Sequence, residues 1–426
     1  MEQISESAAS HDERITYVFY QSIVLKTLAR LDKGCLRLVL PSGEVRYFGD
    51  QLAKQNASIR IVNPEFFKKA LLHGDVGLGE AYVEGDWETE NITHVIEWFL
   101  LNMENLALVS GSRKRFSSVN ILKVFNCLSH LARPNTIRGS RRNIAEHYDL
   151  SNDFYRLFLD PTMSYSSAVF TRSGQSLEEA QKEKYDLLCR RLLLKPGNQV
   201  LEIGCGWGGF AEHAVRHYGV HVTAVTISEE QFKFAKQKFE QEGVSDRITL
   251  LLEDYRFIIG QFDKIVSIEM LEAVGHRFLD TFFAQCHRLL RPHGLLGLQV
   301  ITCPDSRYDT LRRNIDWIQK HIFPGSLLPS VAAINSAVNR TGDLTLHHLE
   351  EHTASYAKTL AIWRQNFNAR ITQVRNLGFS QEFIRKWNYY LSYCEAAFAM
   401  RNIAVVQMVY SRPNNFSLQS TEEDFS

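Results

Sequence analysis

The sequence predicts an α/β protein built around a doubly wound, Rossmann-like sheet, with a smaller α+β domain before it. Short apolar segments alternate with helical patterns from residue 199 onward, as expected for strands joined by crossover helices. A glycine-rich turn with Gly204, Gly206 and Gly208 follows the first of these segments. The chain has 426 residues, more than one domain usually contains.

The composition limits the possible classes. Lys plus Arg and Asp plus Glu both number 48, so net charge indicates no class of partner. Seven scattered cysteines without a C-x-x-C pair argue against a disulfide framework or a metal cluster and are typical of a reducing cytosol. The N-terminus is polar and acidic, and no apolar run approaches the roughly 18 residues of a spanning helix. We therefore expect a cytoplasmic protein, either soluble or peripheral at the inner face of a membrane.

Residues 1–105 are predicted to form the small α+β domain. The expected elements are a helix at 17–30, strands at 36–40, 45–48 and 57–62, and helices at 63–72 and 92–102. The first two strands flank a Pro-Ser-Gly-Glu turn and predict a hairpin. Gly74, Gly77, Gly79 and Gly85 are expected to break the stretch between the last two helices.

Residues 106–142 are predicted to be a basic amphipathic linker. From Asn105 to Ala145 there is no Asp or Glu, while eight basic residues lie within 113–142 and apolar residues recur at roughly helical spacing. Such a helix is typical of a segment that binds an anionic membrane surface. A linker helix with solvated cations is the alternative. One short basic stretch in a neutral protein is weak support for nucleic acid, and we expect none as a partner.

Residues 143–412 are predicted to form the larger domain, followed by a disordered tail at 413–426. Its expected strands are 199–203, 220–226, 248–252, 262–268, 295–301 and 402–410. Its expected helices include 229–242, 277–290, 363–376 and 381–399. Residues 305–360 are predicted to be an insertion of helices and loops that covers the substrate site as a lid.

Polar residues follow the first three strands at the carboxyl edge of the sheet, where such folds bind nucleotide-like ligands. The candidates are Glu202, Gly204, Gly206, Thr226, Ile227, Gln231, Asp254 and Tyr255. Thr226 stands where most Rossmann-like sites have a ribose-binding carboxylate. Asp254 is placed to accept from an adenine amino group, and Tyr255 to cover the ring. The Glu-x-Gly-x-Gly-x-Gly spacing is neither the dinucleotide fingerprint nor a phosphate loop.

Several motifs occur in a recognisable order. They are H-Y-D-L-x-N-D-F-Y at 147–155, L-D-P-x-M-x-Y-S-x-A at 159–168, L-E-I-G-C-G-W-G-G-F at 201–210, V-T-x-V-T-I-S-x-E-Q at 222–231, D-Y-R at 254–256 and S-Y-A-K-T-L-A-I-W at 355–363. Together they closely resemble the cyclopropane-fatty-acyl-phospholipid synthase family, which has the class I S-adenosylmethionine (SAM) methyltransferase fold. The resemblance covers nearly the whole chain outside both tails.

The resemblance implies methyl transfer from SAM to the cis double bond of an unsaturated phospholipid acyl chain. The resulting carbocation would lose a proton, and a cyclopropane ring would close. Tyr165 and Ser166 would border the methionine part of SAM, and His147 and Tyr148 would form a lid over it. The resemblance also makes a homodimer plausible.

In this family a bound bicarbonate is the expected base, and its binding residues can be carried over from the motifs. Glu272, Ile301 and Tyr356 match the family, whereas Ser167 replaces a cysteine, Ala273 a histidine and Gln299 a ligand histidine. Ser167 still has a backbone N–H to donate. Glutamine can donate a hydrogen bond to an anion but cannot become charged or relay a proton.

These departures leave several functions open. Altered donors could still hold the oxyanion and yield a cyclopropane, which we favour. A hydride shift before proton loss would instead give a methyl- or methylene-branched chain, and the E-M-x-E-A-V-G variant at 269–275 resembles relatives of less certain product. A SAM methyltransferase for a soluble small molecule and a non-catalytic lipid-binding scaffold also stay open.

Overall fold

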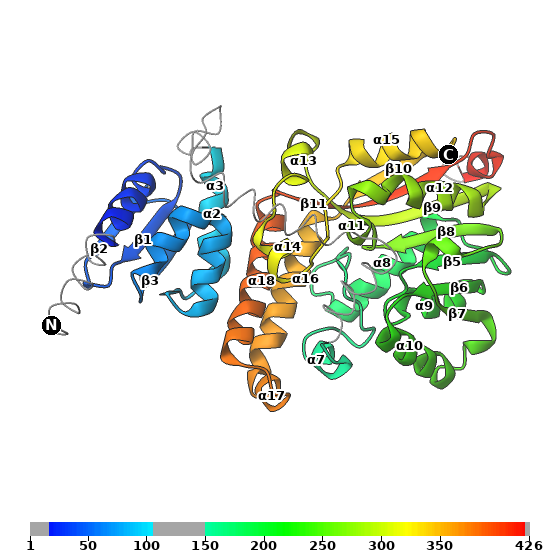
Figure 1. Cartoon of the computed structure of the whole chain (residues 1–426). Helices are drawn as coiled ribbons and strands as arrows, with labels where there is room; N and C mark the ends of the chain where they lie inside the picture. Colours follow the sequence, from blue (N-terminus) through cyan, green and yellow to red (C-terminus); the bar gives the residue numbers. More distant parts are fainter. Residues whose placement is uncertain (1–16, 105–149, 422–426) are drawn as a thin grey trace, which may run out of the picture. The chain divides into compact units, whose positions relative to one another are not determined.

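The computed structural model describes residues 17–104 and 150–421, which fall into two compact units (Figure 1). The first unit comprises 17–104, Asp316–Lys320 and Ile371–Met400, and the second comprises 150–315, His321–Arg370 and 401–421. The expected linker at 106–142 and the lid residues His147 and Tyr148 lie outside the described residues. Within the described ranges, no helix is long and apolar enough to cross a membrane.

The first unit contains a four-stranded sheet in the order β2-β1-β3-β4. Its strands are β1 (Cys35–Val39), β2 (Val45–Gly49), β3 (Asn56–Ile61) and the short β4 (Trp87–Glu88). β1 and β2 form the antiparallel hairpin that the sequence predicts, whereas β3 runs parallel to β1. Residues 17–28 are helical, within the range expected.

The prediction that glycines break the stretch after residue 72 is confirmed at Gly74 and Gly85 and wrong at Gly77 and Gly79, which are helical. α2 (Glu65–Glu84) is kinked at Gly74, where φ is 59° and ψ is −128°, and then continues to a left-handed cap at Gly85. A Cβ at Gly79 would lie 2.5 Å from atoms of Trp317 and 2.7 Å from Tyr389. At this position glycine therefore permits close helix packing within a continuing helix.

Further helices complete the first unit. α3 (Ile92–Leu101) is capped by the Asn91 side chain. α18 (Gln381–Ala399) packs against both α2 and α3, and the unit also includes residues of α14 (Trp317–His321) and all of α17 (Ile371–Asn376). In α18, Arg385 Nε donates to the carbonyl of Tyr82 at 2.7 Å, and Tyr389 stacks on Tyr82.

The placement of α14 and α18 differs from the predicted domain boundaries, which grouped these segments with the larger domain. The helical pattern of α18 was expected, but an apolar helix face does not specify which sheet or helix it will cover. Only long-range packing assigns the aromatic residues of α18 to the N-terminal unit.

The second unit contains a seven-stranded sheet in the order β10-β11-β9-β8-β5-β6-β7 (Figure 1). Its strands are β5 (Gln199–Ile203), β6 (His221–Thr226), β7 (Ile248–Leu252), β8 (Phe262–Ile268), β9 (Leu290–Thr302), β10 (Thr345–Glu351) and β11 (Ala404–Ser411). β5 to β9 pair in parallel, whereas β11 is antiparallel to β9 and β10 is antiparallel to β11. The predicted doubly wound class is confirmed.

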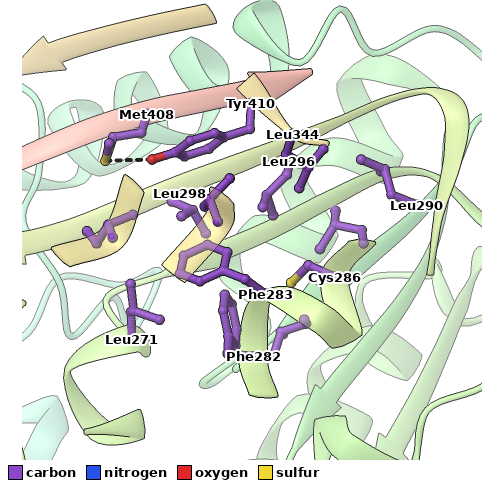
Figure 2. Close-up of a cluster of buried hydrophobic side chains, with 14 of the residues drawn as sticks. Leu271, Phe282, Phe283, Cys286, Leu290, Leu296, Leu298, Leu344, Met408 and Tyr410 are labelled. Atoms are coloured by element: carbon purple, nitrogen blue, oxygen red, sulfur yellow. Dashed lines mark hydrogen bonds between the residues drawn. The ribbon is translucent and has the colours of Figure 1, made fainter. Parts of the chain in front are cut away.

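Helices cover both faces of this sheet. The apolar core on one face involves α8 (Leu177–Arg191), α9 (Gly209–Tyr218) and α10 (Glu229–Gln241), and the core on the other involves α11 (Leu271–Val274), α12 (Leu279–Leu289) and α15 (Val331–Thr341). Figure 2 shows the second core, in which Phe282, Phe283 and Cys286 lie near Leu296, Leu298, Met408 and Tyr410. Neighbouring strand residues alternate between the faces: Val200 belongs to the first core and Leu201 to the second.

The expected insertion at 305–360 is partly a piece of the sheet. It contains α13 (Asp305–Leu311), α15, β10 and the start of α16 (Thr353–Ala369). β10 was not predicted as a strand. Its residues are largely exposed and rich in His and Glu, so it lacks the run of apolar residues typical of a central strand. β10 is an edge strand and pairs with β11 only.

The predicted disordered tail is ordered over its described part. Residues Phe416–Thr421 form a 3-10 helix. The buried Asn415 side chain donates to Ser411 Oγ at 3.0 Å and to the carbonyl of His293 at 3.2 Å. The hydrogen bond to His293, 122 residues away, holds a segment whose polar composition alone indicated disorder.

Candidate active site

The glycine-rich turn joins β5 to α9 at the carboxyl edge of the sheet. Gly204, Gly206 and Gly208 have φ values of 83°, 53° and 81°, which favour glycine. A Cβ at Gly208 would collide with Phe239 of α10, so Gly208 allows helix packing. A Cβ at Gly206 would meet no atom within 4 Å, so this part of the turn faces open space. Gly206 is therefore where a ligand can approach the backbone.

Glu202 has a buried carboxylate oxygen that a ligand could bind. Its side chain is buried, and its Oε2 atom has no hydrogen-bond partner among the residues that the structure describes. Burial raises the pKa of Glu202 to about 8, and the nearby Lys184 opposes the rise. An unpaired buried oxygen is costly unless a bound group satisfies it.

The remaining predicted cofactor residues already have partners within the chain. Thr226 Oγ1 donates to Gln231 Oε1 at 2.8 Å, which links the end of β6 to α10, with Ile227 between them in sequence. Both carboxylate oxygens of Asp254 accept from the guanidinium of Arg256, at 2.8 and 2.6 Å. The Tyr255 ring packs edge-on against Phe282. Their contacts to the ribose and adenine of SAM stay predictions.

Tyr165 and Ser166 lie between an aromatic cluster and a buried lysine. The Tyr165 ring contacts Tyr155 and Trp363, with centroids 5.3 and 5.4 Å apart. Ser166 Oγ accepts from Lys184 Nζ at 2.7 Å. Burial lowers the pKa of Lys184 to about 8. Sequence reasoning missed Lys184, although it lies on the same face of α8 as the buried Ala180 and Leu188.

Glu269 is the centre of the predicted anion site and was not among the predicted residues. Its Oε1 atom accepts from the backbone N–H of Ser167 and from Gln299 Nε2, both at 2.8 Å. Its Oε2 atom accepts from the Tyr356 hydroxyl at 2.7 Å. Burial raises the pKa of Glu269, and the hydrogen bonds from Tyr356 and Gln299 oppose the rise. Three of the five predicted catalytic residues therefore converge on one carboxylate.

The sequence contained a signal for Glu269. It directly follows β8 and stands three residues before Glu272, which was predicted from the motif. A carboxylate at the carboxyl end of a central parallel strand points to the ligand-binding edge of such a fold.

Glu272 and Ile301, the other two predicted catalytic residues, also lie together. Glu272 Oε1 accepts from the backbone N–H of Ile301 at 2.5 Å, whereas Oε2 is buried and has no hydrogen-bond partner in the described ranges. Burial, with a contribution from the charge of Glu269, raises the pKa of Glu272 to about 8. At neutral pH Glu272 is therefore mainly protonated.

The raised pKa of Glu272 predicts a pH-dependent difference in stability between the native protein and the Glu272→Gln variant. The folded state holds a proton on Glu272 that the unfolded chain releases near its ordinary pKa of 4.5, so native stability falls as pH rises from there through about 8. Glutamine does not titrate. The variant should gain stability relative to the native protein by at most about 1.4 kcal/mol per pH unit in this window. Melting temperatures from about pH 5 to about pH 9 would test this, and a pH-independent difference would contradict it.

The doubly wound fold, with an open glycine turn and a buried acid beside it, is the architecture of a SAM-dependent methyltransferase, and the comparisons with known proteins assign the chain to that class. Residues 136–408 match the family model described as mycolic acid cyclopropane synthetase. The chain belongs to this family.

Relatives and solved structures agree with this assignment. The chain is 37% identical to tuberculostearic acid methyltransferase UfaA1 of Mycobacterium tuberculosis, over 88% of each chain. It is 38% identical to cyclopropane-fatty-acyl-phospholipid synthase of Escherichia coli, over 84% of this chain and 88% of that one. The structure of mycolic acid cyclopropane synthase CmaA1 complexed with SAH and CTAB matches with a TM-score of 0.59 and 33% identity, over 64% of this chain and 98% of that one.

Proposed function

We propose that this enzyme transfers a methyl group from SAM to the cis double bond of an unsaturated acyl chain in a membrane phospholipid. The observation that carries the proposal is the carboxylate pair Glu269 and Glu272 at the end of β8, in a methyltransferase of this family. An alkene is a weak nucleophile, and its methylation leaves a carbocation on the acyl chain. An ionised carboxylate at the carboxyl edge of the sheet, with a neutral acid beside it, can stabilise that charge and accept a proton.

The residues of the chain have separate tasks in this proposal. SAM supplies the electrophilic methyl group, and the open side of Gly206 with the unpaired oxygen of Glu202 would hold it. The aromatic rings of Tyr165 and Trp363 would exclude water and present π-faces to a cation. Tyr356 joins this cluster through an edge contact with Trp363 while its hydroxyl binds Glu269.

The product is the finer part of the proposal. We favour a cyclopropane, and a methyl- or methylene-branched chain is the alternative. The names of the two relatives above support an acyl substrate, but their nearly equal identities of 37% and 38% do not choose between these products. A non-catalytic lipid-binding scaffold does not account for the carboxylate pair, and a soluble methyl acceptor does not account for the basic segment at 113–142.

The membrane is part of the proposal as well. An acyl chain within a bilayer is reached only by a protein that lies on its surface. We propose contact at the inner face through the basic residues in 113–142, with a homodimer presenting two such segments to one membrane. Co-sedimentation with anionic vesicles should weaken at high salt if these cations make the contact.

The test is incubation of the full-length protein with methyl-labelled SAM and vesicles of cis-unsaturated anionic phospholipid. We expect label in the lipid fraction and none with vesicles of fully saturated phospholipid. Gas chromatography with mass spectrometry of the acyl esters should show one added CH₂ and no remaining alkene. An added CH₂ with the alkene retained would establish the branched product. SAM binding without lipid labelling would overturn the phospholipid substrate.

A further inference from the structure

The hydrogen-bond donors that the family resemblance assigns to bicarbonate are taken by a side chain of this protein. The Ser167 N–H and Gln299 Nε2 bind one oxygen of Glu269, and the Tyr356 hydroxyl binds the other. A free bicarbonate would need these same donors. The described residues therefore do not fit bicarbonate at this position, because a carboxylate of matching charge and shape already fills it.

The geometry also favours the ionised form of Glu269. Two fixed donors, the Ser167 N–H and the Gln299 amide, point at its Oε1 atom, and hydrogen bonds that a carboxylate accepts stabilise its charge. The Gln299 amide is oriented for donation, because its Oε1 atom accepts from Gln407 Nε2 at 2.9 Å and Gln407 in turn accepts from Arg191 at 2.7 Å. Unlike the histidine of the family motif, Gln299 donates at every pH.

Glu269 has an unusual backbone. Its φ is +50°, in the left-handed region, and its N–H donates to the carbonyl of Gln299 at 2.7 Å. This conformation costs a non-glycine residue roughly 1–2 kcal/mol. Glycine would relieve the strain, so a glutamate here indicates that its side chain has a function.

We propose that the Glu269 carboxylate is the built-in base of this enzyme and that its methyl transfer does not require bicarbonate. This inference rests on the proposed function. For the cyclopropane product, a C–H bond of the added methyl breaks, and its electron pair forms the last carbon–carbon bond of the ring. The proton forms an O–H bond on Glu269, and the positive charge of the chain and the negative charge of Glu269 cancel. For a methylene-branched product, a hydride shift comes first, and the same electron pair forms a double bond.

Glu272 has a different task in this arrangement. Its Oε2 atom is the unpaired one, and its protonated form at neutral pH leaves Glu269 as the single charge of the pair. Two adjacent carboxylates that differ in protonation can divide the roles of base and neutral neighbour.

The test compares Glu269→Gly with Glu269→Gln in buffer freed of bicarbonate. Native activity should be the same with and without added bicarbonate. Glu269→Gly should lower turnover by about 10²- to 10⁴-fold, the usual contribution of a general base. Glycine suits the φ of +50° and exposes the three donors, so added bicarbonate or formate should restore activity at least about tenfold. Glu269→Gln fills the space with an amide and should not be rescued.

A binding measurement gives a second readout that does not depend on turnover. Calorimetry with bicarbonate should detect binding to Glu269→Gly and none to the native protein, while SAM binding is kept by both. Bicarbonate-dependent native activity, or full activity of Glu269→Gly without any anion, would overturn the inference. If the native protein labels no lipid, the proposed function fails. In that case, bicarbonate binding by the native protein would also overturn the inference that Glu269 fills the anion site. Bicarbonate binding by Glu269→Gly alone would uphold that inference.

Discussion

Gly206→Ala is expected to lower the affinity for SAM at least about tenfold, which corresponds to about 1.4 kcal/mol, while the protein stays folded. The Cβ of alanine would enter the open side of the turn, where no atom of the described chain lies within 4 Å. A ligand can approach the backbone from this side. The added methyl group would therefore overlap with the ligand and would not clash with core side chains. Calorimetric titration with SAM would measure the loss.

Gly197→Ala is the matched control for this variant. Gly197 also has a positive φ, 84°, and a Cβ there would also meet nothing within 4 Å. It precedes β5, at the opposite end of that strand from the glycine turn. Both variants should lose roughly 1–2 kcal/mol of stability through backbone strain. Only Gly206→Ala should lose affinity for SAM. Equal SAM affinity in the two variants would contradict the assignment of the turn as the cofactor site.

Gly79→Ala is expected to destabilise the first unit by about 1–3 kcal/mol, the usual cost of overpacking. A loss of stability would be informative, because alanine normally stabilises a helix interior by about 1 kcal/mol relative to glycine. Here the added Cβ would lie 2.5 Å from the Trp317 ring and 2.7 Å from the Tyr389 ring. Both rings are fully buried and have little room to move, so α2 must move away from α14 and α18. The melting temperature would report the loss.

Lys68→Ala is the control in the same helix. Lys68 is exposed, and its ion pair with Glu65 is long, at 3.8 Å, so its replacement should change stability by no more than about 0.5 kcal/mol. A Gly79→Ala protein more stable than the native one would mean that residues 316–320 and 371–400 do not pack on α2 as described.

The local pattern of the chain was sufficient for much of the architecture. The parallel strands β5 to β8 were predicted almost to the residue, because each is a short apolar run bounded by turn residues. The glycine turn and the carboxyl-edge position of Thr226 and Asp254 followed from the same alternation. Motifs in order were enough to identify the family, and the family match bore this out.

Other elements depended on contacts that no local pattern contains. β10 was missed because an edge strand has no continuous apolar run. α18 was expected as a helix, but its partners α2 and α3 lie about three hundred residues earlier, as the 303-residue separation of Arg385 and Tyr82 illustrates. The described part of the tail is held by a hydrogen bond to His293, 122 residues away, which its polar composition did not predict.

The candidate active site likewise depends partly on local sequence and partly on tertiary contacts. The sequence by itself determined which residue types reach the carboxyl edge of the sheet, because strand ends and motif positions are local properties. Only the tertiary structure decided that Ser167, Gln299 and Tyr356 bind Glu269. They are separated from it by 102, 30 and 87 residues, and their donors converge because the sheet brings the end of β8, β9 and α16 together. A chain pattern records what each residue can donate or accept, whereas the three-dimensional fold determines which acceptor it meets.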